Sequence, residues 1–148
     1  KGERENVVAF LDESGRAWEK AGDFVRARDT FEDLVRADPE APIAPEAPPR
    51  AATNARRAYL ADRQPDRYAS LVRIVEEHLT NYGSDESAGD IHYLLATMRK
   101  AERRYDEAIE TLWRARAIAN RFGGSHAQRD LIEWTLTEAA LRGKRETL

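Results

Sequence analysis

Apolar residues recur at three- and four-residue steps through most of the chain, and this is the spacing of amphipathic helices. The first predicted helix covers about residues 5–21 and ends at Gly22. Asp23 is suited to cap a second helix, which stops at Asp38-Pro39. The connection between them is short, so we expect an antiparallel pair.

The residues expected to face each other in this pair differ in size. Gly15 and Ala27 are small and let the two backbones approach closely, whereas Trp18 and Phe31 supply the apolar area that holds the helices together. We therefore expect this pair to be the best-formed unit of the chain.

A proline-rich stretch follows. Five of the six prolines lie in PEAPIAPEAPP, between Pro39 and Pro49. This composition disfavours helix and favours extended polyproline II, so residues 40–50 are predicted to be a loop inserted between two helix pairs. Ile43 is its only sizeable apolar side chain, and we expect little to anchor it. A stiff spacer is the favoured role, with a docking motif for an aromatic-lined groove as the alternative.

Two more helix pairs and a final helix are predicted after this stretch. The middle pair covers about residues 51–83 and has an alanine-rich first helix. The next pair covers about 88–122, and the final helix about 125–143. Gly143 matches a turn glycine, and we expect the helix to end there without a partner helix.

The final helix is apolar on two sides. Trp134 and Leu141 lie on the side away from the predicted core, and a terminal repeat normally needs a polar cap. We therefore predict that these two side chains are exposed or covered by a second copy of the chain.

The stretch from Leu11 to Pro39 resembles the tetratricopeptide repeat, whose signature is W-x2-L-G-x2-Y, A-x3-F and P over about 34 residues. The matching positions hold Leu11, Ser14, Gly15, Trp18, Ala27, Phe31 and Pro39, of which Ser14 departs from the pattern. The resemblance implies an all-α, TPR-like α-solenoid of about three antiparallel helix pairs plus a terminal helix. The junction GGSHAQRD also resembles proteins of the tetratricopeptide repeat protein thirty-eight type.

The third repeat departs from the signature at two positions. His92 stands where tryptophan is usual and Arg99 where tyrosine is usual. We therefore expect the first helix of this repeat to carry something other than plain core at these points.

Length and composition limit the alternatives. The chain has 148 residues, 41% of them apolar, and no apolar run long enough to cross a membrane, so we expect one soluble domain. The absence of cysteine excludes disulfides and thiol nucleophiles and favours a cytoplasmic location. The formal net charge of −3 gives no general attraction to nucleic acid or anionic lipid. Because the sequence starts at Lys1, we expect a segment of a larger protein.

Residues for catalysis or metal binding are sparse. His78, His92 and His126 are not in a metal-ligand spacing. Acidic pairs such as Glu76-Glu77 are sequence neighbours, which point about 100° apart on a helix. Neither a phosphate-binding loop nor a nucleophile elbow is found in the sequence. We therefore expect no enzyme activity, no cofactor and no metal.

The predicted function is a protein–protein interaction scaffold. First helices line the concave side of such a repeat, and their polar residues are the candidate contacts for a peptide or partner helix: Asp12, Arg16, Glu19, Lys20, Tyr93, Thr97, Lys100, Glu133, Thr137 and Arg142. The alternative is an assembly or regulatory domain that self-associates through Trp134 and Leu141. A nucleic-acid-contacting module is disfavoured, because acids are interspersed among the arginines.

Overall fold

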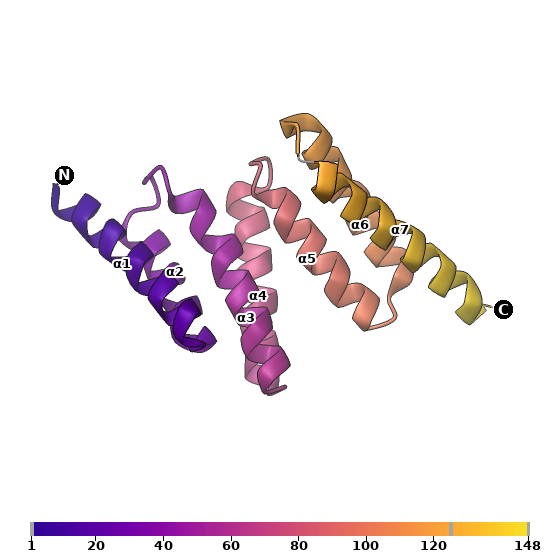
Figure 1. Ribbon diagram of the computed structural model, residues 1–148, viewed down its shortest axis with the longest axis horizontal. Helices are drawn as coiled ribbons and strands as arrows, with labels where there is room; N and C mark the ends of the chain where they lie inside the picture. The colour runs from indigo at the N-terminus through magenta and orange to yellow at the C-terminus, as the bar shows by residue number, and fades with distance from the viewer. Residues whose placement is uncertain (1, 125, 148) are drawn as a thin grey trace. The chain divides into compact units, whose positions relative to one another are not determined.

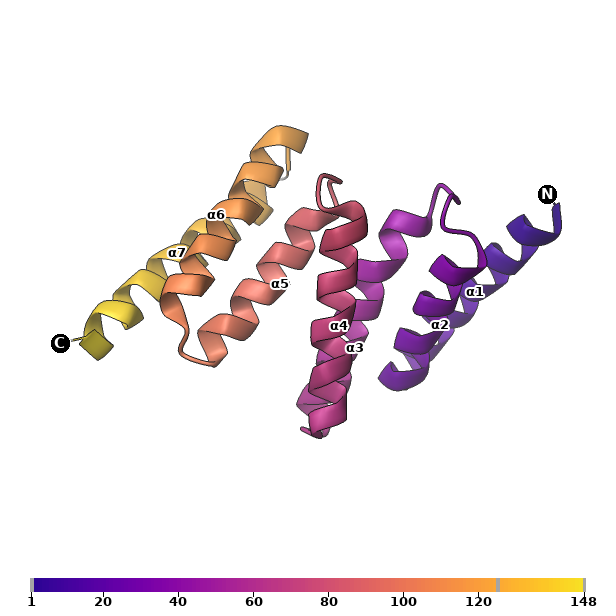
Figure 2. The same ribbon diagram turned by 180° about the vertical axis from the view of Figure 1, so that it is seen from behind.

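The computed structural model of the chain describes residues 2–124 and 126–147, and the side chains of all of these except 126–128 and 145–147. Within these residues the protein contains seven α-helices, one 3-10 turn and no strand, so the all-α prediction is confirmed (Figures 1 and 2). None of the described helices is both long enough and apolar enough to cross a membrane. The chain divides into two compact units, Lys1–Tyr82 and Gly83–Leu148.

The first unit is a run of helices in which each packs against the next in the sequence (Figure 1). Its elements are α1 (Gly2–Ala21), α2 (Phe24–Ala37), the 3-10 turn η1 (Ala44–Glu46), α3 (Ala47–Ala61) and α4 (Pro65–Tyr82).

The connection between α1 and α2 has the predicted local structure. Gly22 has a φ of 80°, in the left-handed region that favours glycine. The Asp23 carboxylate caps α2 by accepting a hydrogen bond from the backbone N–H of Arg26 at 3.1 Å. These two features turn the chain so that the buried ring of Phe31 lies against Gly15 of α1.

The prediction of a loop over residues 40–50 is wrong for its second half. Residues 44–46 form η1, and α3 begins at Ala47 with proline in its first turn. Proline is compatible with that position, because the first N–H groups of a helix have no partner within the helix. The segment is also anchored, since the small side chains of Ala41, Ala44 and Ala47 are buried.

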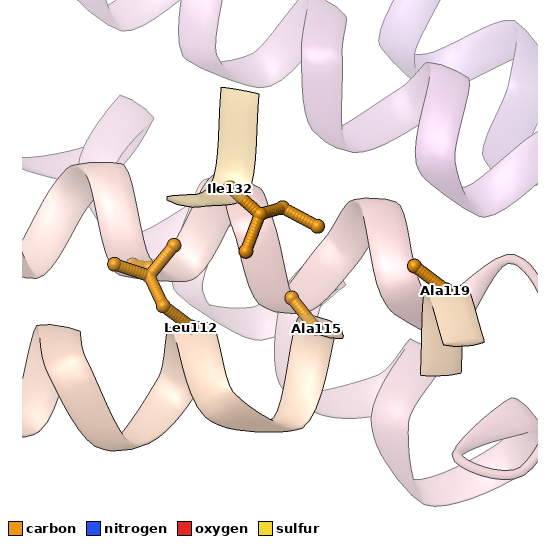
Figure 3. Packing of buried hydrophobic residues seen from close by; sticks show 5 residues of the cluster. Leu112, Ala115, Ala119 and Ile132 are labelled. Atoms are coloured by element: carbon orange, nitrogen blue, oxygen red, sulfur yellow. The ribbon is translucent and has the colours of Figure 1, made fainter. Parts of the chain in front are cut away.

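The second unit consists of α5 (Ala88–Ala101), α6 (Tyr105–Phe122) and α7 (His126–Thr147), with α6 packed against both neighbours. The bounds of α5 and α6 agree with the pair predicted over about 88–122. Its core combines small and branched residues, namely Ala96, Leu112, Ala115, Ala119 and Ile132. Figure 3 labels the last four of these. Alanine on α6 allows close approach, and Ile132 of α7 fills the space between the helices.

The predicted end of the final helix at Gly143 is wrong. α7 continues through this residue to Thr147, while Ser125, at the predicted start, lies outside the described residues. A Cβ atom at position 143 would lie 3.2 Å from the Cβ of Tyr105 on α6. Gly143 therefore marks a close approach between two helices and not a turn.

Candidate functional site

An open groove of about 970 Å³ lies in the first unit, between the N-terminal half of α1 and the segment that joins α2 to α3. The groove has an apolar surface made of Val8, Ala9, Ala41, Pro42 and Ile43. Val8 and Ala41 are buried, whereas Ile43 is half-buried and accessible from the groove. A partner could therefore bury apolar side chains here.

Carboxylates surround this apolar surface. The charged residues among the described lining are Arg4, Glu5, Asp12 and Glu13 of α1, together with Asp38 and Glu40 of the connecting segment. One positive and five negative side chains give a formal charge of 1 − 5 = −4. We call this site the acidic groove, and it is suited to a ligand that is both apolar and positively charged.

The wall opposite α1 is held in place by local hydrogen bonds. The Asp38 carboxylate accepts a bond from the backbone N–H of Glu40 at 3.2 Å, and the Asp38 carbonyl accepts one from Ala41 at 3.2 Å. The carbonyl of Ala41 then accepts a bond from the N–H of Ala44 at 2.9 Å. Glu40 and Ile43 are thus presented by a hydrogen-bonded turn.

The predicted contact residues on α1 lie in three different settings. Asp12 lines the acidic groove and accepts a hydrogen bond from Arg16 Nε at 3.0 Å, so Arg16 lies beside the site. Lys20 is exposed. Glu19 contacts α3, because its carboxylate accepts hydrogen bonds from Asn54 Nδ2 at 2.7 Å and Arg50 Nη1 at 3.3 Å. Glu19 therefore joins two helices of the unit.

In the second unit, the predicted contact residues of α5 are bonded mainly to α7. Lys100 Nζ donates to Glu138 at 3.0 Å, and this bond is the main reason why the pKa of Glu138 is lowered. Arg142, also predicted, lies 2.8 Å from the other oxygen of Glu138. The hydroxyl oxygens of Tyr93 and Thr135 are 3.4 Å apart. Lys100 and Tyr93 therefore tie α5 to α7, whereas Arg142 pairs within α7.

The other predicted residues of the second unit make local or inter-helix bonds. Glu133 accepts a bond from Arg116 of α6 at 2.8 Å, so it lies toward α6. The hydroxyls of Thr97 and Thr137 donate to backbone carbonyls of their own helices. The acidic groove receives none of these side chains, since its lining belongs to the first unit.

His92 and Arg99 form a polar contact region in the α5–α6 pair. His92 is 9% exposed, and burial, followed by the charges of Arg114 and Arg99, lowers its pKa below the ordinary value of 6.5. Arg99 donates to the hydroxyl of Thr111 and lies 3.7 Å from Glu107. The imidazole therefore loses its proton more readily than a free one, beside two cations.

The described residues contain no group of three or more histidines and acids placed to hold a metal ion. His78 is buried in α4, and the side chain of His126 lies outside the described residues. Together with His92, these were the histidines singled out from the sequence.

The side chains expected to be exposed on the final helix are exposed. Trp134 is 71% and Leu141 55% accessible, and Leu131 is 49% accessible. On the opposite side of the same helix, Ile132 and Ala139 are buried. α7 therefore has one face in the core and a second apolar face in solvent.

Of the residues that line the acidic groove, only Asp12 was predicted from the sequence as a contact, so Glu40 and Ile43 were missed. A signal was present on α1, where residues 5, 8, 9, 12 and 13 follow a helical spacing and combine acidic with small apolar side chains. That signal identifies one wall of the groove.

In comparisons with known proteins, no family model and no curated protein matches the chain.

Proposed function

We propose that the chain is a protein-interaction module with a TPR-like solenoid architecture, and that its acidic groove binds a basic amphipathic helix of a partner protein. The observation that carries this proposal is the apolar groove surface bordered by five carboxylates and one guanidinium. The repeat architecture is supported by small or aromatic residues buried at signature positions, namely Gly15, Ala27 and Phe31. The assigned activity is binding and not catalysis.

The two parts of the groove have different energetic roles. Burial of apolar partner side chains against Val8, Pro42 and Ile43 supplies affinity, at about 25 cal/mol per Å² of apolar area. The carboxylates supply specificity and a faster association, because exposed charges steer an oppositely charged ligand. The same charges repel nucleic acid and anionic lipid.

A helical ligand fits this site better than an extended strand. The groove runs beside the helix α1, and the described part of the unit contains no sheet edge to which a strand could be added. Helix-in-groove recognition uses apolar anchors at i, i+3 or i+4, and i+7, with polar residues outside them. We expect lysine or arginine at those outer positions, opposite Glu13 and Glu40.

A display selection tests the proposal and can be run while the partner is still unidentified. A library of helical peptides about four turns long is selected on the wild-type chain. The expected winners combine an apolar stripe with lysine or arginine flanks. Selection in parallel on Glu13→Lys/Glu40→Lys should not enrich them. The matched control is Asp29→Lys/Asp33→Lys, which reverses two exposed acids of α2 that pair with Arg28 and Arg36 away from the groove.

Fluorescence anisotropy with one selected peptide then gives the affinity. We expect the groove reversal Glu13→Lys/Glu40→Lys to weaken binding at low salt by at least about tenfold, and the control reversal Asp29→Lys/Asp33→Lys by much less. Added salt should weaken wild-type binding. Enrichment of acidic peptides, or equal losses in the groove variant and the control, would contradict the proposal. Circular dichroism verifies that each variant is folded.

A further inference from the structure

The outward face of α7 has an apolar pair in its centre. Trp134 and Leu141 are seven positions apart, which places them on one side of the helix two turns apart. Both are more than half exposed, whereas Thr135 and Ala139 on the inner side are buried. A tryptophan with this exposure offers a large apolar area for association.

Among the described side chains of α7, the exposed charges around this pair are divided by sign along the helix, whereas Arg129 and Glu138 are half-buried. Asp130 and Glu133 lie on its N-terminal side, and Arg142 and Lys144 lie on its C-terminal side. All four residues are exposed. Glu133 and Lys144 are 11 positions apart, close to three full turns, so they share one flank of the helix. If an identical face is turned end to end and placed against this one, the acidic end of each face therefore meets the basic end of the other.

We propose that this face binds the same face of a second copy of the chain, with the two α7 helices antiparallel across a two-fold axis near Thr137. In this arrangement Trp134 of each copy packs on Leu141 of the other. A two-fold axis of this kind brings like flanks together, so Glu133 of one copy meets Lys144 of the other, twice per dimer. Parallel pairing would place the two acidic ends at one level and the two basic ends at another, and the charges disfavour it.

The existing ion pairs of this face do not oppose the dimer. Glu133 bonds to Arg116 and Arg142 bonds to Glu138, but these side chains remain between one quarter and two thirds exposed. Exposed pairs of this kind contribute little, and their partners can be shared or exchanged at small cost. The second copy adds opposite charges to side chains that are already ordered on the surface.

Sedimentation of the whole chain over a range of concentrations is the first test. We expect the mass to rise from 16.8 kDa to twice that value, and Trp134→Ala to raise the dissociation constant by at least about tenfold. Phe10→Ala is the matched control, because Phe10 is an exposed aromatic residue (68%) on α1, and it should leave the constant unchanged. A chain that stays at 16.8 kDa up to about 1 mM would overturn the proposal and leave the face to a different partner.

A charge exchange tests the antiparallel register. Glu133→Lys and Lys144→Glu should each weaken self-association, because each places like charges together at both contacts. Mixing the two variants should restore a one-to-one dimer, since both contacts then join a lysine to a glutamate. Glu110→Lys, which breaks the comparable Arg114 pair on α6, is the control and should have no effect. A mixture no stronger than either variant alone would exclude this register, whatever the groove binds.

Discussion

Gly15 of α1 lies directly under the ring of Phe31 of α2. A Cβ atom at position 15 would be 2.6 Å from Cζ of that ring and less than 3.0 Å from two further ring atoms. The ring is fully buried, so it has little room to move away. The two helices can therefore approach this closely only because residue 15 is glycine, which has no side chain.

Gly15→Ala is expected to destabilise the first unit. Alanine gains up to about 1 kcal/mol in helix propensity over glycine, but overpacking a core costs about 1–3 kcal/mol, and the contact below 3 Å makes the second effect the larger. Urea unfolding followed by circular dichroism measures the difference. Gly2→Ala in the same helix has no atom within 4 Å of its Cβ and serves as the control. An equal or greater stability of Gly15→Ala would contradict the packing described.

Glu19→Ala should destabilise the same unit, because it removes one of the two acceptors of a buried amide group. Asn54 is fully buried, and its Nδ2 group donates to Glu19 at 2.7 Å and to the Arg50 carbonyl at 2.8 Å. Loss of such a partner costs about 1–3 kcal/mol, whereas Lys20→Ala at the exposed neighbouring position should cost less than about 0.5 kcal/mol. A double-mutant cycle with Asn54→Ala should give a coupling of at least about 0.5 kcal/mol. Additive effects would show that the bond does not contribute.

Local signals explain which parts of the fold could be predicted. The bend after α1 was predictable because Gly22 and Asp23 act through their own backbone and side chain. The start of α3 was not predicted, because the effect of proline depends on its position within a helix. The alanines that anchor the segment, such as Ala44, are buried by other helices and give no local signal.

The candidate site could not be predicted in full, because it is formed by residues that are far apart in the sequence. The spacing of Glu5, Ala9 and Asp12 indicates one face of α1, but only the fold brings Glu40 and Ile43 opposite that face. The same limit explains why Glu19 was predicted as a partner contact, since its hydrogen-bond donor Asn54 is 35 residues away. Exposure of Trp134 was predictable because α7 is apolar on two sides.

Ile132→Ala should destabilise the second unit by about 2–4 kcal/mol, since it removes a fully buried side chain from the core and leaves a cavity (Figure 3). Leu131→Ala, at the adjacent and half-exposed position, should cost less than about 1 kcal/mol. Urea unfolding at low protein concentration measures both effects without a contribution from self-association. Similar losses of unfolding free energy in the two variants would contradict the orientation of α7, in which Ile132 faces the core and Leu131 faces solvent.

The stability of the second unit should depend on pH through His92. Its pKa is lowered in the folded protein by burial and then by Arg114 and Arg99, so the unfolded chain binds the proton more strongly. Stability must then fall as the pH drops below the ordinary value of 6.5 toward the lower pKa of the folded state. His92→Gln removes the titration and should flatten the curve in that window, relative to the wild type. Arg114→Gln should raise the pKa of His92 and reduce the slope. An NMR titration that places the pKa of His92 at or above 6.5 would contradict this account of the site.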